Sequence, residues 1–228
     1  MPGKKNVRNG KRSQKRAQRV PKNLPMMSKV PGSTRVNLTY SAPAQQIVES
    51  AAGTGVTYFY RLNSVFDPDA SGVGAVAIGY NTYSALYLNY KVHRVTVRLT
   101  GFVGGGTGNS HFANVSMAPI PSQSVVPANR ATWKTIPGGV TACITSSSNG
   151  GMNRVSYTKS YELARVAAVT KQQYANDMDF SGAIASNPAR QMYLMVSLDS
   201  AGSSTVMGLT YAITISYLVE WFNPVPLQ

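Results

Sequence analysis

The stretch YAITISYLVEW (residues 211–221) alternates apolar and polar side chains along almost its whole length. One side of it carries Ile213, Ile215, Tyr217, Val219 and Trp221. The other side carries Thr214, Ser216, Leu218 and Glu220. Successive side chains of a strand point to opposite faces of a sheet, so this pattern predicts a long β-strand with one face in a core.

The same period-two pattern returns elsewhere in the chain. It predicts further strands in VTYFYRL (56–62), RVTVRLT (94–100) and QMYLMVSL (191–198). Weaker strand candidates are HFANVSMA (111–118), GVTACIT (139–145) and SYELARVAAV (160–169). Only TKQQYAND, near Thr170, is a candidate for a short helix. With loops rich in Gly, Pro, Ser and Asn between these runs, the sequence predicts an all-β, eight-stranded antiparallel sandwich.

Charge divides the chain into unlike parts. Residues 1–35 hold eleven Lys or Arg and no acid, whereas residues 36–228 hold eleven basic and eight acidic residues. Such a run of like charge buries too little apolar surface to order itself. We therefore expect a disordered basic arm (1–35), a linker rich in Pro, Gly, Ser and Thr (36–54) and a β domain (55–228).

The arm has the chemistry of a nucleic-acid-binding segment, because Lys and Arg neutralise phosphates without reading sequence. The candidate contacts are Lys4, Lys5, Arg8, Lys11, Arg12, Lys15, Arg16, Arg19 and Lys22. The arm holds no aromatic residue, so it offers no surface on which bases stack. Alternatives are a nuclear-localisation signal and a solubility tail. No apolar stripe opposes the charges and no run of about 18 apolar residues exists, so we predict no membrane partner and a soluble chain.

A second, smaller basic set lies on the predicted strands: Arg61, Lys91, Arg94 and Arg98. If one face of the sandwich meets nucleic acid, these residues extend the lining begun by the arm. The alternative is that they are solvated or paired with acids.

Few residues point to catalysis or metal binding. Asp67 and Asp69 are candidates for paired catalytic carboxylates, for ligands of a hard cation such as calcium at a subunit boundary, or for the carboxylates of a turn. Asp-Pro-Asp before Ala-Ser-Gly favours the turn. The same holds for Asp177 and Asp179. One cysteine, Cys143, and two histidines provide no zinc-ligand spacing and no nucleophile context, so we predict no enzyme and no cofactor. Tyr83, Tyr87 and Tyr90 are candidates for contacts between subunits.

Residues 58–101 resemble coat proteins of small circular single-stranded DNA viruses that encode a replication initiator. A strand runs into Phe66-Asp67-Pro68-Asp69, then Gly72-Val73-Gly74, Gly79-Tyr80 and an alternating strand. A second block, residues 162–198, and the closing Trp221-Phe222-Asn223-Pro224 follow in the family's order. The segment Ala75-Val76-Ala77-Ile78 departs from the family pattern, which leaves both a DNA and an RNA genome open.

The resemblance implies a single jelly-roll capsid protein that assembles into a small icosahedral virion of about 60 copies, the T=1 arrangement. It further implies a packaged single-stranded genome, with single-stranded DNA favoured. A DNA genome would place the protein in the host nucleus and make the nuclear import machinery a partner. Alternatives are the coat protein of a single-stranded RNA virus and a cellular nucleic-acid-binding protein with a basic tail. A β-sandwich that acts on polysaccharides would have no use for the arm.

Overall fold

Two antiparallel sheets make up the β domain of the computed structural model, which describes residues 30–52, 54–104, 111–123, 133, 135–146, 154–200 and 206–226. The five-stranded sheet contains β1 (Ser33–Val48), β9 (Gly208–Pro224), β3 (Tyr87–Gly104), β6 (Arg154–Glu162) and the short β7 (Ser181–Ala183). The four-stranded sheet contains β2 (Val56–Arg61), β8 (Tyr193–Asp199), β4 (His111–Ile120) and β5 (Val140–Ser146).

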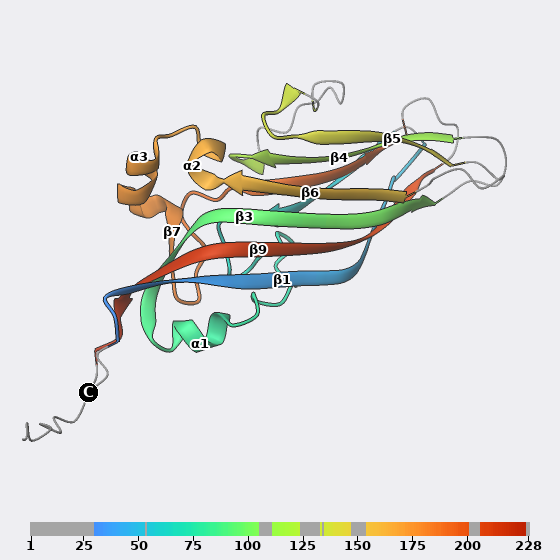
Figure 1. The fold of residues 1–228 in the computed structure, drawn as a ribbon. Coiled ribbons are helices and arrows are strands. Elements are labelled where there is room, and N and C mark those ends of the chain that lie inside the picture. Colours follow the sequence, from blue (N-terminus) through green and yellow to red (C-terminus); the bar gives the residue numbers. More distant parts are fainter. Residues whose placement is uncertain are drawn as a thin grey trace, which may run out of the picture. The chain divides into compact units, whose positions relative to one another are not determined.

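The strand order is that of a jelly roll. One sheet runs β1-β9-β3-β6 and the other runs β2-β8-β4-β5, so β1 and β2, β3 and β4, β5 and β6, and β8 and β9 each lie in opposite sheets (Figure 1). All the ladders are antiparallel. The predicted all-β jelly-roll sandwich is confirmed, and β7, which pairs with the start of β3, is a ninth strand beyond the eight predicted.

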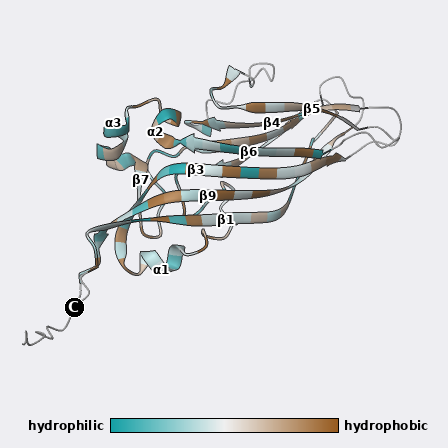
Figure 2. Ribbon diagram, in the orientation of Figure 1, coloured by the Kyte–Doolittle hydropathy of each residue, from teal (hydrophilic) through white to brown (hydrophobic). Residues whose placement is uncertain are grey.

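The core lies between the sheets, and β9 shows how the sequence builds it. Its residues alternate between buried and partly exposed from Leu209 to Trp221, as the period-two pattern predicts. Figure 2 shows hydrophilic and hydrophobic bands along these strands. Tyr60 of β2 and Tyr211 of β9 meet across the core, where their hydroxyls are 3.0 Å apart. This contact joins the two sheets.

The predicted linker at residues 36–54 is wrong over most of its length, because residues 36–48 belong to β1. Leu38, Tyr40 and Ala42 are buried, and the intervening positions are more exposed. The register against β9 shifts between Ala42 and Gln45. A bulge of this kind reverses which positions face inward, so no single alternation runs through the strand and its small and polar residues read as a loop.

Three short helices lie at one end of the sandwich: α1 (Tyr80–Ser84), α2 (Leu163–Val166) and α3 (Lys171–Asn176) (Figure 1). The helix predicted near Thr170 is confirmed, since Thr170 and Gln173 form a reciprocal capping box at the start of α3. The strand predicted at residues 160–169 ends at Glu162 instead. Leu163 and Ala164 are adjacent and both buried, which one face of a strand cannot achieve.

A second apolar cluster covers the far side of the four-stranded sheet. Trp133, from the connection between β4 and β5, packs on Ala118, Ile120 and Met195, and Phe59, Ile136 and Tyr193 lie around them. Phe59 and Met195 are cross-strand partners and alternate with the core residues Tyr60 and Leu194. The outer side of this sheet is therefore covered around Met195 and Phe59, whereas the five-stranded sheet keeps one polar side.

Candidate nucleic-acid interface

The side of the five-stranded sheet that faces away from the core is polar and rich in arginine. We call it the polar sheet face; it consists of the residues of β1, β9, β3 and β6 that alternate with the buried ones. Its charged residues are Arg35, Arg94, Arg98, Arg154, Glu162 and Glu220. Hydroxyl groups lie between them, and they pair across strands in Ser41–Thr214 and Thr96–Ser160. The face is thus built from hydrogen-bonding groups and positive charge.

Strand β3 places two of the predicted nucleic-acid contacts on this face. Val95, Val97 and Leu99 are fully buried, so the alternating residues Arg94 and Arg98 point outward. The ladders set Arg94 opposite Leu218 of β9 and Arg98 opposite Thr214. Two of the four basic residues predicted on strands are therefore brought together, as the prediction requires.

The two acids of the polar sheet face are paired. Glu220 Oε2 lies 2.6 Å from His93 Nε2 and 3.0 Å from Arg35 Nη2. Although partial burial acts in the opposite direction, the hydrogen bonds from His93 and Arg35 hold the pKa of Glu220 below its usual value of 4.5. Glu162 Oε1 lies 3.8 Å from Arg94 Nε. The acids therefore neutralise charge at one end of the face.

Arg98 and Arg154 remain exposed, and no acidic partner for either lies within the part of the chain that the structure describes. Arg35 and Arg154 were not among the predicted contacts. Arg35 falls in the predicted arm. Arg154 lies in the segment RVSYTKS at the start of β6, six residues before the start of the strand predicted at 160–169. Reading that alternation further toward the N-terminus would have found Arg154.

Arg61 does not belong to the interface and corrects the prediction. Its side chain is 13% exposed, and Nη1 lies 2.6 Å from Asp67 Oδ2 and 2.7 Å from the carbonyl oxygen of Asp69. Nε donates to Gln191 Oε1 at 2.8 Å. The guanidinium group holds the turn after β2 in place and is not available to a ligand.

Lys91 is likewise buried, at 4% exposure, and is not available either. Its Nζ donates to the carbonyl oxygens of Tyr174, Ala175 and Asp177, at 3.1, 2.6 and 3.0 Å. These carbonyls lie at the C-terminal end of α3, where a cation complements the helix dipole. Burial lowers the pKa of Lys91. The residue caps a helix inside its own chain.

The paired aspartates act as turn residues, as the sequence favoured. Asp69 Oδ1 accepts hydrogen bonds from the backbone N–H of Ser71 at 2.9 Å and the hydroxyl of Tyr58 at 2.7 Å. Asp177 accepts from the backbone N–H of Asp179 at 2.9 Å. In the described ranges, no three His, Cys, Asp or Glu side chains gather closely enough to share a metal ion.

Two of the three tyrosines predicted at subunit contacts are core residues, which corrects that prediction. Tyr87 is 2% exposed and Tyr90 is fully buried. The Tyr90 hydroxyl donates to the carbonyl of Ser186 at 2.9 Å. Tyr83 is partly exposed and stacks on Trp221 with ring centroids 5.8 Å apart. Only Tyr83 remains a candidate for a contact between subunits.

The nine predicted arm contacts, Lys4 to Lys22, lie outside the described residues. Cys143 is an exposed thiol on β5. Among the helices that the structure describes, none has the length and apolar character needed to cross a lipid bilayer.

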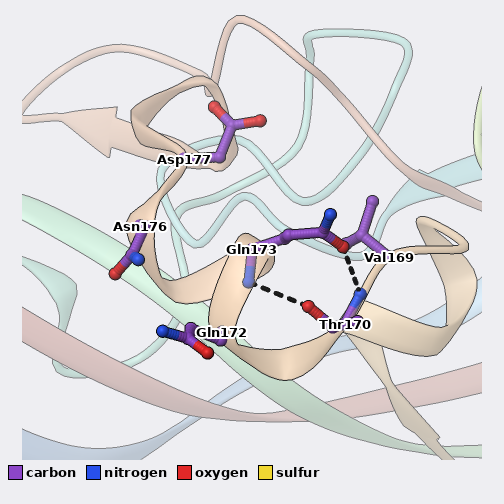
Figure 3. Close-up of a pocket in the computed structure, with 6 residues that line it drawn as sticks. All are labelled: Val169, Thr170, Gln172, Gln173, Asn176 and Asp177. Atoms are coloured by element: carbon purple, nitrogen blue, oxygen red, sulfur yellow. Dashed lines mark hydrogen bonds between the residues drawn. The ribbon is translucent and has the colours of Figure 1, made fainter.

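A shallow pocket lies beside α3 (Figure 3). It is lined by Val169, Thr170, Gln172, Gln173, Asn176 and Asp177. Figure 3 shows that the Thr170 and Gln173 side chains are engaged in the capping box rather than directed at a ligand. The pocket contains neither a basic side chain nor an aromatic ring, so it fits neither phosphates nor bases.

No family model matches the chain, and no curated protein matches its sequence. Solved structures to which it is similar include a semi-empty virus-like particle of the nodavirus of the giant freshwater prawn Macrobrachium rosenbergii, at 8% identity and a TM-score of 0.47, covering 88% of this chain and 99% of that one. Cocksfoot mottle virus has 12% identity, a TM-score of 0.46 and coverage of 85% and 95%. The decameric BFDV capsid protein has 10% identity, a TM-score of 0.44 and coverage of 83% and 99%. With TM-scores below 0.5, the fold assignment rests on this chain's own strand order.

Proposed function

We propose that the chain is a viral capsid protein that assembles into a small icosahedral shell and packages a single-stranded genome. The observation that carries the proposal is an acid-free run with ten Lys or Arg (residues 1–32) directly before a jelly-roll sandwich with an arginine-bearing polar face. A sandwich of this kind can tile a closed shell through repeated symmetric contacts. The basic run supplies the attraction that draws subunits to a polyanion.

The number of positive charges in residues 1–35 is sufficient for genome packaging. About 60 subunits would bring on the order of 650 positive charges from residues 1–35, enough to neutralise much of a genome of about a thousand nucleotides. Attraction between these charges and the phosphates offsets the mutual repulsion of subunits that each carry a net charge of +14. Arg94 and Arg98 extend the phosphate-binding lining from the basic run onto the sheet.

Single-stranded DNA is the favoured genome within this proposal, on the sequence resemblance alone. With a DNA genome, the protein would enter the host nucleus through the nuclear import machinery, and the basic run would also serve as the nuclear-localisation signal. A single-stranded RNA genome is the alternative, because Lys and Arg bind the phosphates of both.

Electron microscopy of the purified full-length protein, combined with nuclease digestion, tests the proposal. We expect closed, uniform shells that protect nucleic acid, and separate digestion of the released material with DNase and RNase identifies its type. The matched variant lacks residues 1–30 and keeps β1 whole; we expect it to lose most of the protected nucleic acid. A full-length protein that stays monomeric over a range of salt concentration and pH, while still binding nucleic acid, would contradict the capsid function and favour a cellular binding protein.

A further inference from the structure

We propose that the polar sheet face carries a base-stacking site for single-stranded nucleic acid, formed by Phe102 and Arg154 at the end of the face away from the helices. The inference rests on the proposed function and deepens it. It assigns base contact to the sheet, whereas the basic run before the sheet lacks any aromatic residue.

Phe102 is an exposed aromatic residue, and no aromatic ring among the described residues packs against it. It lies on β3 with strands on both sides, opposite Arg154 of β6 and Thr210 of β9. It is nevertheless 52% exposed, because it belongs to the polar sheet face and not to the core. Directly opposite residues of an antiparallel pair have Cβ atoms about 5 Å apart, so the side chains of Phe102 and Arg154 start from neighbouring positions on this face.

The two side chains flank a hollow on the sheet surface. Phe102 and Arg154 line it together with Thr100 and Gly101. Gly101 alternates with Phe102 and is buried, and a Cβ there would come within 2.7 Å of the Thr210 carbonyl oxygen and of the Tyr211 Cβ atom. On the polar sheet face the hollow is therefore lined by an aromatic ring and a cationic side chain.

This combination suits a nucleotide better than it suits a protein partner. An exposed aromatic ring gives any base a face for stacking, and stacking is worth about a five- to hundredfold difference in affinity per base. A guanidinium group binds a phosphate through two parallel hydrogen bonds. Among the described residues, the ladder neighbours of Phe102 are Arg154 and Thr210, neither of which carries a negative charge that would repel a nucleic acid.

The rest of the face continues the site along the strand. Phe102, Arg98 and Arg94 are successive fourth residues on one side of β3, so about 13 Å separates each from the next. Arg98 has no acidic partner among the described residues, and the acids Glu162 and Glu220 lie toward the other end, opposite Arg94 and Lys91. A single-stranded nucleic acid lying along β3 would therefore contact the ring of Phe102 and then the guanidinium groups of Arg98 and Arg94.

Binding of short oligonucleotides to the full-length protein separates the contribution of base stacking on Phe102 from that of the phosphate contact of Arg154. The probes are fluorescently labelled oligothymidine and oligouridine of about 20 nucleotides, titrated by anisotropy at several salt concentrations. We expect Phe102→Leu to weaken binding about five- to tenfold without changing the slope of log K against log salt concentration. We expect Phe102→Tyr to bind like the wild type. Arg154→Gln should make the slope shallower by about 0.7, the value for one phosphate contact with a single strand.

Matched controls come from the same chain. Phe112 is 58% exposed on the four-stranded sheet opposite Thr145, and Phe112→Leu should leave binding unchanged. Arg165→Gln removes an exposed charge beyond the sheet and should leave the slope unchanged.

Wild-type affinity and slope in both Phe102→Leu and Arg154→Gln would overturn the stacking site and leave the proposed function standing, since residues 1–35 still bind. No binding of either probe by the wild-type protein would overturn both. Equal losses in Phe102→Leu and Phe112→Leu would show a general effect of apolar surface and overturn the site alone. The probe bound more tightly by the wild type indicates which type of strand the site prefers.

Discussion

Nε2 of His93 lies 2.6 Å from Oε2 of Glu220, although the two residues are 127 positions apart in the sequence. Arg35 contacts the same oxygen from β1, so one carboxylate ties the edge strand β1 to the central strands β9 and β3. Burial opposes ionisation of this carboxylate, and the two hydrogen bonds still hold its pKa below 4.5. A carboxylate whose pKa is lower in the folded than in the unfolded state stabilises the fold above the unfolded value, and that stabilisation disappears as the pH falls through the folded value.

Glu220→Gln should lower the free energy of unfolding at pH 7 by about 0.5–1 kcal/mol. The difference from the wild type should shrink as the pH falls from about 4.5 toward 2, because the wild-type carboxylate is then protonated as well. Urea titrations at pH 7 and near pH 3 measure both values. Glu162→Gln, at the looser pair with Arg94, is the control and should change stability by less than about 0.3 kcal/mol. A Glu220→Gln difference that is the same at both pH values would contradict the assigned role.

Arg61→Lys should lower the free energy of unfolding by about 2–3 kcal/mol, because an ammonium group cannot replace the fork that holds Asp67, Gln191 and the carbonyl of Asp69. Urea denaturation measures the change. Arg98→Lys is the matched control: this arginine is exposed without an acidic partner in the described part of the chain, so stability should change by less than about 0.5 kcal/mol. Equal stability of the two variants would contradict the structural role of Arg61.

Lys91→Met should lower the free energy of local opening of α3 by about 2–3 kcal/mol, since it leaves the carbonyls of Tyr174, Ala175 and Asp177 without their common donor. The effect should be local to α3. Hydrogen exchange should therefore speed up at the amides of Tyr174 and Asp177, which donate within this helix, and stay unchanged in β4. Uniform acceleration over the whole domain would show that Lys91 acts globally and not as a cap.

Removing residues 1–30 should leave the urea midpoint of the β domain unchanged, because β1 begins at Ser33. Removing residues 1–48 should abolish cooperative unfolding. That deletion takes away the buried residues Leu38, Tyr40, Ala42 and Ile47 and uncovers one edge of β9. Circular dichroism during urea titration compares the two truncations. A cooperative transition in the longer deletion would mean that β1 is dispensable.

The sequence predicted strands correctly where the same alternate residues face the core along the whole strand. Strands β9, β3, β2 and β8 follow their alternation, and the jelly roll follows from them and from the resemblance. Prediction failed at β1, where a bulge between Ala42 and Gln45 changes which positions face inward. It failed again after Glu162, where tertiary packing buries two adjacent residues in α2.

The interface was predicted less well than the fold, because alternation gives a residue's face but not its partners. Arg61 and Lys91 occur on strands just as Arg94 and Arg98 do, yet carbonyl oxygens enclose the first two: those around Arg61 come from the turn directly after β2, and those around Lys91 come from α3, more than 80 positions later. Those carbonyls belong to a turn and to a helix end, neither of which a pattern on the strand itself can reveal. Tyr90 failed for a similar reason, since Ser186 and Trp221, which contact it, come about a hundred positions later in the chain.

The position of β9 between β1 and β3 has a consequence for biosynthesis. Strands β1 and β3 can pair with β9 only after β9 has been synthesised. The ion pair between Arg35 of β1 and Glu220 of β9, for example, joins residues 185 positions apart. On a ribosome, the five-stranded sheet cannot close until nearly the whole chain has emerged, and β1 and β3 spend that time with unpaired edges. Translation up to the end of β9 takes on the order of ten seconds or more, and the five-stranded sheet cannot form before then.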